Sequence, residues 1–449
     1  MLQIGWAVQD ITPSRPAMLY GQMHPRIAKE AMDRLLVTAL AIEGGNPTDG
    51  AILISCDLCG IPDALQRAVR DRLGKRSLGI PPDTVFLAAT HTHTSLALDA
   101  GLYEHPGGDV MTFEECMALV ADRAADAAEE AWKSRAPHAF APAFGQAVVG
   151  HNRRAVYADG RAQMYGQTNR EDFIAIEGYE DHSLDLLFWW GVDGRLDGVT
   201  LDVPCPSQVV EHSQVFSADY WDDVRTELRA RWGKGLHVLP LCGAAGDISP
   251  HFIVYGKQEE EMRRRRGVSE RQEIAQRIAD GMARALACTK PVEGEIAFAH
   301  SVRRVELAPR QVTKEERDRA AAEYPHVVEQ HDPDSWYPRQ LRGTIERFDS
   351  GRQRTHPVPV EIHVLRIGDV ALATSPFELY SDFGMRIKAR SPAVQTVIVQ
   401  LAAGDGWYLP SERAVRGGGY GAIPAVAKVG PEGGKQLVEE TLQIIQELF

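Results

Sequence analysis

The chain has 449 residues, 44% of them hydrophobic and 25% charged, which is typical of a globular protein with a large core and excludes a disordered or fibrous one. A formal net charge of −13 disfavours contact with a phosphate backbone, and the one basic run, residues 263–266, closely follows the acidic run 259–261, so we expect no nucleic-acid partner. No apolar stretch approaches the ~20 residues of a membrane span, no secretory signal begins the chain, and six cysteines are too sparse for a disulfide framework, so we expect a soluble, cytoplasmic protein.

Short apolar runs alternate with amphipathic helical patterns along the chain. AILIS (51–55), TVFLAAT (84–90) and HVLPLCG (237–243) are each followed by a helical pattern, an alternation typical of α/β layers. Further strands are predicted at residues 184–192, 197–203, 360–375 and 393–403. We therefore predict an α/β fold, with large mixed sheet layers flanked by helices, in a single domain spanning residues 1–449.

A CxxC pair, Cys56 and Cys59, follows the first apolar run. Such a pair can do redox chemistry or form half of a zinc site, but the chain contains no second CxxC. We interpret the two cysteines as small residues packed at the end of a strand.

The strongest chemical feature is the sequence THTHTS at residues 90–95, which follows the apolar run VFLAA. In an α/β sheet, side chains at the carboxyl end of a strand face the crevice where ligands bind, and an HxH spacing aims two imidazoles the same way. Two imidazoles are costly to bury without partners, so we predict that His91 and His93 belong to a functional site.

Residues 313–356 differ in composition from the rest of the chain. They are dense in charge and carry four aromatic residues, Tyr324, Trp336, Tyr337 and Phe348. We interpret this segment as an insertion, either a solvated helical hairpin or a lid over the site.

Further polar clusters stand among the apolar runs, and each alone could be turn or capping chemistry. Their order along nearly the whole chain resembles that of the neutral/alkaline ceramidase family, whose members are zinc-dependent amidases that cleave the amide of an N-acylated sphingoid base. The resemblance implies a neutral-ceramidase-like catalytic domain and Zn²⁺ as its cofactor. The clusters that carry it are GWAVQDITP (5–13), THTHTS (90–95), HNRR (151–154), PCPS (204–207), GAAGDISP (243–250), SPFE (375–378), GWYLP (406–410) and GGGYGA (417–422).

The resemblance also implies roles for individual residues. Four would hold the metal and four would act on the substrate. The implied metal ligands are His91, Cys205, Glu378 and Tyr408. The implied catalytic residues are His93, Arg153, Ser249 and Tyr420, of which Ser249 matches a serine proposed in some accounts as a nucleophile.

Cys205 is the one departure from the family pattern, because the family has a zinc-binding histidine in its place. A thiolate is a good zinc ligand, but it lowers the net charge at the metal by one unit, so a bound water should be harder to deprotonate than the ~7 pKa of favourable zinc sites. His212, seven residues later, is a weaker alternative ligand.

The resemblance therefore implies a zinc-dependent, amidase-like hydrolase. Zinc would activate a water, His93 and Tyr420 would donate to the oxyanion or leaving group, and Arg153 would hold an anionic or hydroxyl-rich part of the substrate. Asp247 is expected to brace the loop that carries Ser249.

The expected substrate is a small soluble molecule cleaved at an amide, ester or glycoside-like bond, since the lipid-facing features and the immunoglobulin-like domain of the family are missing. A second copy of the chain, in a homo-oligomer, is an open option. Two other hypotheses remain: a metal-free hydrolase with Cys205 or Ser249 as nucleophile, and a non-catalytic binding protein.

Overall fold

The structure is a computed structural model that describes residues 1–45, 49–101, 103–330 and 332–449. Its largest element is an eight-stranded sheet with the order β14-β13-β12-β7-β1-β4-β5-β6. The sheet is mixed, because β5–β6 and β13–β14 pair in parallel and the other neighbours are antiparallel. Its strands are β1 (Leu2–Asp10), β4 (Leu36–Glu43), β5 (Gly50–Cys56), β6 (Val85–Ala89), β7 (Ala136–Gln146), β12 (Ser183–Gly191), β13 (Leu196–Val203) and β14 (His237–Cys242).

A second sheet packs against the first. It has four strands in the order β16-β17-β18-β20. One apolar cluster joins Leu53 and Phe86 of the large sheet to Leu365, Leu372 and Val397 of the smaller one, so the two sheets share a core layer. The strands of the second sheet are β16 (Phe298–Leu307), β17 (Val358–Ile367), β18 (Val370–Thr374) and β20 (Gln395–Val399).

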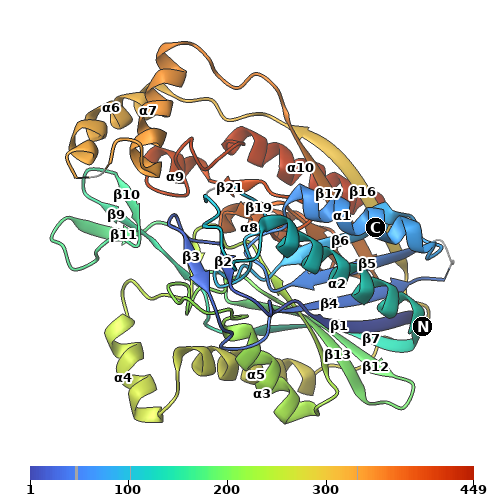
Figure 1. Ribbon diagram of the computed structural model, residues 1–449. Coiled ribbons are helices and arrows are strands. Elements are labelled where there is room, and N and C mark those ends of the chain that lie inside the picture. The colour runs from blue at the N-terminus through green and yellow to red at the C-terminus, as the bar shows by residue number, and fades with distance from the viewer. Residues whose placement is uncertain (46–48, 102, 331) are drawn as a thin grey trace.

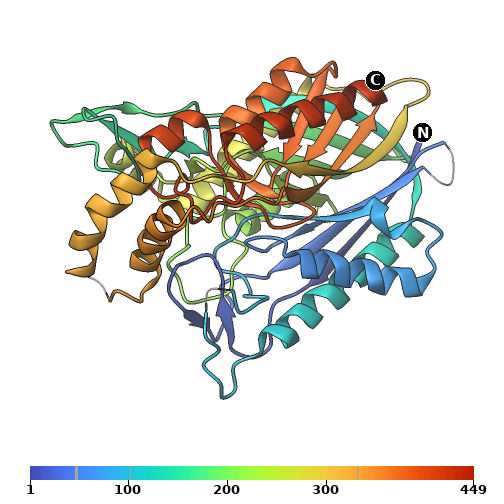
Figure 2. The ribbon, with the colours of Figure 1, turned by 90° about the horizontal axis from the view of Figure 1, so that it is seen from above.

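Helices cover the outer faces of this pair of sheets (Figures 1 and 2). Helices α1 and α2 pack on the β1-β4-β5-β6 half of the large sheet, α3 and α5 on its other half, and α8 and α10 on the second sheet. In Figure 2 the blue and teal helices lie on one side and the red α10 on the other. The helices are α1 (Asp63–Arg76), α2 (Phe113–Lys133), α3 (Tyr220–Trp232), α4 (Gly256–Arg266), α5 (Glu270–Ala287), α8 (Ser381–Arg390), α9 (Glu412–Gly417) and α10 (Pro431–Leu448).

This layering explains the apolar runs in the sequence. Every residue of β5 and of β6 is buried, because helices cover one face of these strands and the second sheet covers the other. Strands buried on both faces have continuous rather than alternating apolar sequences. The predicted α/β fold with a large mixed sheet is confirmed.

Short strands occupy the loops around the sheets. They pair as β2–β3, β8–β15, β19–β21 and β10-β9-β11. Their bounds are β2 (Ala17–Leu19), β3 (Arg26–Ala28), β8 (His151–Asn152), β9 (Arg154–Tyr157), β10 (Ala162–Met164), β11 (Phe173–Ile176), β15 (Ile248–Ser249), β19 (Phe377–Leu379) and β21 (Trp407–Leu409), with a short 3-10 helix at Pro82–Thr84.

The charged segment 313–356 contains two helices, α6 (Lys314–Val328) and α7 (Trp336–Asp349), which pack against each other. Thr313 and Glu316 form a capping box that starts α6. Figure 1 shows the two helices beside the β10-β9-β11 sheet, at one end of the molecule. Within the ranges that the structure describes, no helix has the length and apolar character to cross a membrane.

Candidate active site

His91 lies just beyond the carboxyl end of β6, beside the residues that follow β5. The two strands pair in parallel, and the pairing continues past their ends, where Thr92 N donates to Leu58 O at 3.2 Å. This arrangement places His91 against Cys59. His91 has a φ of 62°, a left-handed conformation that costs a non-glycine residue about 1 kcal/mol or more and that is common at functional sites.

The two nitrogens of the His91 ring face different partners. Nδ1 lies 2.5 Å from Cys59 O, and because a carbonyl oxygen only accepts, Nδ1 carries a proton. Nε2 lies 3.3 Å from Glu378 Oε2 and 3.4 Å from His93 Nε2. Burial lowers the pKa of His91, but Cys59 and Glu378 outweigh it and raise the pKa well above its usual value, so a proton lies between Nε2 and the carboxylate. A metal ion that displaced this proton would find a histidine whose other nitrogen is held by a carbonyl, as in metal-binding histidines.

Glu378 and Tyr408 reach the site together from β19 and β21. These strands are parallel and the two residues are register partners, so their side chains leave the ladder on the same side. Burial opposes ionisation of Glu378, but His91 and Arg153 outweigh it and lower the pKa of the carboxyl. Burial raises the pKa of Tyr408 well above its usual value, and the charge of Glu378 adds to the effect, so the phenol keeps its proton.

Arg153 lies behind Tyr408 and is almost fully buried. It donates to Tyr408 Oη at 3.3 Å, to Gly246 O at 3.1 Å and to Tyr165 Oη at 3.0 Å. Its Nε is buried and has no hydrogen-bond partner among the described residues. These contacts support a role in positioning Tyr408, while a direct contact of Arg153 with substrate stays a prediction.

His93 is held from the loop that follows β13. Its Nε2 lies 2.9 Å from the Gln208 amide, and its Nδ1 lies 3.4 Å from Glu211 Oε2 without hydrogen-bond geometry. Burial lowers the pKa of His93, but Cys59 and Glu211 outweigh it and raise the pKa to about 9. Gly21 packs on the ring, where a Cβ would lie 2.6 Å from the imidazole carbon Cγ, so no larger residue fits there.

Cys59 is a site residue that the sequence interpretation missed. Its Sγ lies 3.6 Å from His91 Nδ1, and ligand atoms of Cys59, His91 and His93 all lie within 4.8 Å of one another. Burial opposes the thiolate, but the charges of His93 and His91 outweigh it and lower the pKa of Cys59 to about 6. The packing interpretation is confirmed for Cys56, which lies in the apolar core with a raised pKa, and is incomplete for Cys59, which is buried but also lines a cavity together with His91 and His93.

A small cavity of about 90 Å³ opens onto these side chains. It has room for a group the size of a carbonyl or a few waters. Five residues predicted from the sequence line it together with Cys59, while Arg153 lies outside the lining. The five are His91, His93, Glu378, Tyr408 and Tyr420.

Cys205 and Ser249, also predicted from the sequence, do not line this cavity. Cys205 Sγ bonds to Pro206 O at 3.4 Å within an apolar cluster, and burial raises its pKa well above the usual value. Ser249 Oγ accepts from Tyr165 Oη at 3.1 Å, which links it to Arg153. A ligand role for Cys205 and a nucleophilic role for Ser249 stay predictions that these contacts do not support.

Neighbouring residues complete this picture. His212, the alternative ligand named from the sequence, has an 80% exposed side chain, whereas the adjacent Glu211 lies 3.4 Å from His93 Nδ1. The predicted bracing role of Asp247 is confirmed, because its carboxylate accepts from Asn152 Nδ2 at 2.8 Å and from Ser381 N at 2.8 Å.

The side chains around the cavity fit a zinc-type ion. Imidazole, thiolate, carboxylate and phenol oxygen are all ligands that such ions take, and they converge from four separate stretches of chain. The point between His91 Nε2 and Glu378 Oε2, where the proton of His91 lies, is where a cation would be most stabilised. Residues His91, Glu378, Tyr408 and Cys59 could therefore hold a metal.

Comparison with known proteins agrees with this fold. No protein-family model matches the sequence, and no curated protein matches it significantly. The structure of neutral ceramidase from Pseudomonas aeruginosa matches with a TM-score of 0.72 and 17% identity, over 100% of this chain and 75% of that one. The chain has a neutral-ceramidase-like fold. A structure of ceramidase complexed with C2 matches equally, with a TM-score of 0.72, 17% identity, and coverage of 99% and 75%.

The comparison therefore confirms the predicted neutral-ceramidase-like fold over the whole chain. At 17% identity, the likeness concerns the fold and leaves the chemistry to the residues of this chain.

Proposed function

We propose that this neutral-ceramidase-like chain is a metal-dependent hydrolase that cleaves an amide or a related acyl bond in a soluble substrate. The observation that carries the proposal is the short approach of His91 Nε2 to Glu378 Oε2, 3.3 Å, with His91 Nδ1 fixed on Cys59 O. A buried carboxylate that faces an imidazole nitrogen stabilises a cation between them, either a proton or a metal ion.

The proposed metal ligands are His91, Glu378 and Tyr408, with Cys59 as the thiolate. Cys59 takes the role that the sequence suggested for Cys205, since its thiol lies at the cavity and has a lowered pKa. A bound Zn²⁺ would supply Lewis-acid chemistry and lower the pKa of a water molecule.

His93 and Tyr420, which also line the cavity, would bind and protonate the substrate. His93, with a pKa of about 9, carries a proton at neutral pH that it can give to the leaving nitrogen. Gln208 and Glu211 fix its ring. Tyr420 lines the cavity and keeps its proton because burial raises its pKa, so its hydroxyl can donate to the developing oxyanion.

Elemental analysis of the purified protein tests the metal directly. We expect near-stoichiometric zinc or a similar divalent ion, lost in His91→Ala, reduced in Cys59→Ala and retained in Cys205→Ala, which serves as the matched cysteine control. Hydrolysis of soluble N-acyl amides should stop with a chelator and return with added zinc. Metal retained in His91→Ala and lost in Cys205→Ala would sink the proposed ligand set.

One observation favours a second candidate, a thiol-dependent hydrolase. Cys59 has a pKa of about 6 and lies 3.6 Å from His91 Nδ1, the features of a nucleophilic cysteine beside an imidazole. The two candidates differ in one simple experiment. Activity that survives a chelator and disappears after alkylation of Cys59 identifies the thiol mechanism, whereas activity lost to the chelator and restored by zinc identifies the metal mechanism.

A further inference from the structure

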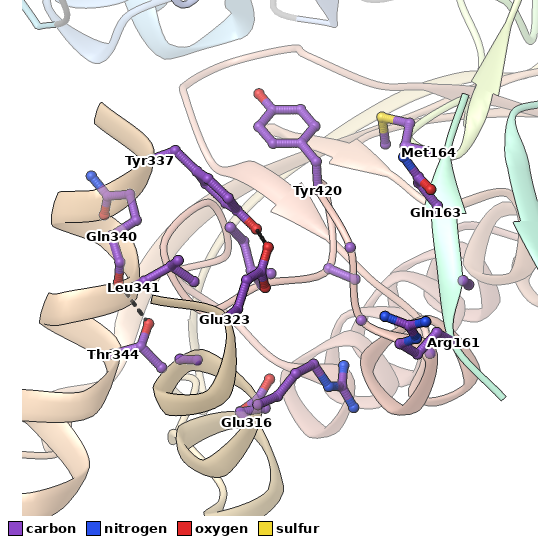
Figure 3. A pocket seen from close by; sticks show the side chains of 18 of the residues that line it. Arg161, Gln163, Met164, Glu316, Glu323, Tyr337, Gln340, Leu341, Thr344 and Tyr420 are labelled. Carbon is purple, nitrogen blue, oxygen red and sulfur yellow. Dashed lines mark hydrogen bonds between the residues drawn. The ribbon is translucent and has the colours of Figure 1, made fainter. Parts of the chain in front are cut away.

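A second cavity, much larger than the first, lies beneath the α6–α7 hairpin. Its volume is about 800 Å³, within the range of small-molecule binding sites. Figure 3 shows its two walls: Tyr337 and Glu323 come from the hairpin helices, and Arg161, Gln163 and Met164 come from the facing hairpin of β10. None of the roles assigned above uses this cavity.

Tyr420 connects the two cavities, since it lines both. Its ring lies edge-on to Tyr408, with centroids 5.6 Å apart, and edge-on to Trp336 of α7, with centroids 6.0 Å apart. Tyr420 thus contacts both a residue proposed to hold the metal, Tyr408, and a residue of the charged insertion, Trp336.

The loop that carries Tyr420 is held on both sides. On one side, the fully buried Arg154 donates to Gly418 O at 2.7 Å. On the other side, Arg319 of α6 donates to Arg416 O at 2.9 Å. The guanidinium of Arg319 packs so closely on Gly418 that a Cβ added there would lie 1.9 Å from it. The hairpin is therefore joined to the active-site loop by specific contacts rather than projecting freely into solvent.

The charges on the cavity wall are balanced. Arg161 pairs with Asp159, Arg170 with Asp172, and Glu316 with Arg310. The two other charged lining residues are Arg319 and Glu323, one of each sign. A wall without net charge attracts neither an anion nor a cation strongly, and so favours a neutral ligand.

The uncharged lining groups fit hydroxyls and rings. The side-chain amides of Gln163 and Gln340 make no hydrogen bond to other described residues, and each offers both a donor and an acceptor. Glu323, which accepts from Tyr337 Oη at 2.6 Å, has a second oxygen left to accept. The tyrosine rings supply negative π faces that suit the electropositive C–H face of a saturated ring.

We propose that this cavity is a subsite for a neutral, hydroxyl-rich ring, the chemistry of a sugar residue, and that it holds the part of the substrate remote from the bond cleaved at His93. That the ring belongs to the hydrolysed substrate rests on the proposed hydrolase function. Binding of the ring in the larger cavity does not depend on catalysis.

Ligand-observed NMR saturation transfer on the full-length protein tests the subsite, with cellobiose as probe because it is neutral and has no amide to be hydrolysed. We expect cellobiose to bind the unaltered chain and to bind His91→Ala equally well. Affinity should fall about tenfold in Tyr337→Ala, a loss of the size expected for a ring contact plus a hydrogen bond. Tyr255→Ala, which removes a 61% exposed tyrosine on another surface, is the matched control.

Two further probes separate the ligand classes, and thermal unfolding shows whether each variant is folded. Inorganic phosphate and glycylglycine should bind less than cellobiose. No cellobiose binding, equal loss in Tyr337→Ala and Tyr255→Ala, or preference for phosphate or the dipeptide overturns the subsite. Should Tyr337→Ala unfold, Gln340→Ala replaces it, with a several-fold loss expected. Cellobiose binding in a protein that lacks metal and hydrolytic activity leaves the subsite standing and removes only the hydrolase proposal.

Discussion

The two cavities differ in how the fold builds them. The smaller one takes its chemical groups from residues at or just after strands, such as His91 after β6 and Glu378 in β19, and most of these side chains are buried and held by several contacts. The larger one is walled by a helical hairpin and by a short hairpin of strands, and its side chains are partly exposed. Groups that break bonds must be held in a fixed geometry by the packed sheets. Residues that only recognise a substrate can lie on an inserted segment at the edge of the fold.

His91→Ala should have the largest effect, because it removes the residue that contacts Glu378, His93 and Cys59 in the smaller cavity. We expect loss of the metal and a fall in kcat/KM of roughly 10³-fold for an N-acyl amide, since the oxyanion and the attacking water lose their stabilisation. His212→Ala, which removes an exposed imidazole outside the site, should change neither quantity. Equal effects of the two substitutions would contradict the assignment of the site.

Substitutions of two cysteines can be compared, Cys59, which lines the smaller cavity, and Cys205, which is buried in an apolar cluster. Cys59→Ala should lower metal affinity and kcat/KM by about 10 to 100-fold. Cys205→Ala should leave kcat/KM unchanged and lower the free energy of unfolding by about 1 kcal/mol, because it removes one buried sulfur from an apolar cluster. Metal titration and thermal unfolding measure the two effects. The reverse pattern would return Cys205 to the ligand set.

The contrast between these cysteines also shows what the sequence could supply. The strands, their buried character and the position of THTHTS at a strand end followed from apolar runs, because burial on both faces leaves a plain pattern. Two successive runs joined by a helix also imply parallel neighbours, whose carboxyl ends meet. That pattern brings Cys59 and His91 together, whereas the CxxC spacing and the lack of a second CxxC carry no information about this contact.

Other site features had no local signal. Glu211 reaches His93 only because the loop after β13 folds back across the end of β6, with His93 N bonded to Ser207 O. Nothing in the sequence VVEH distinguishes that carboxylate from a surface one. The cavity beneath α6 and α7 likewise depends on how the hairpin docks, and the sequence indicated only that the segment was charged and aromatic.

Trp336→Ala alters the contact between the two cavities, where Trp336 packs on Tyr420. Loss of the ring packed on Tyr420 should lower kcat/KM by about fivefold to tenfold, close to the ~1 kcal/mol of an aromatic pair, mainly through a higher KM. Metal content should not change. Trp336→Phe, which keeps a ring, should recover most of the loss. A loss of metal in Trp336→Ala would show that the hairpin supports the smaller cavity and not only the larger one.

A change in ionic strength should have the smallest effect on ligand affinity, and it distinguishes a neutral ligand of the larger cavity from a charged one. Raising salt from about 0.01 M to about 1 M shortens the Debye length from about 30 Å to about 3 Å, which weakens attraction between a charged ligand and exposed charges such as Arg161. Because the arginines and carboxylates of the larger cavity are paired or balanced in sign, the affinity for cellobiose should change less than about twofold over this range. An anionic ligand bound by unpaired guanidinium groups would lose affinity steeply. The same salt titration is repeated in Asp159→Asn, which removes the ion-pair partner of Arg161. In this variant the affinity for cellobiose should still not depend on salt, whereas phosphate should now bind, with an affinity that falls as salt is raised. That result would show that the Arg161–Asp159 pair prevents anion binding in the unaltered chain.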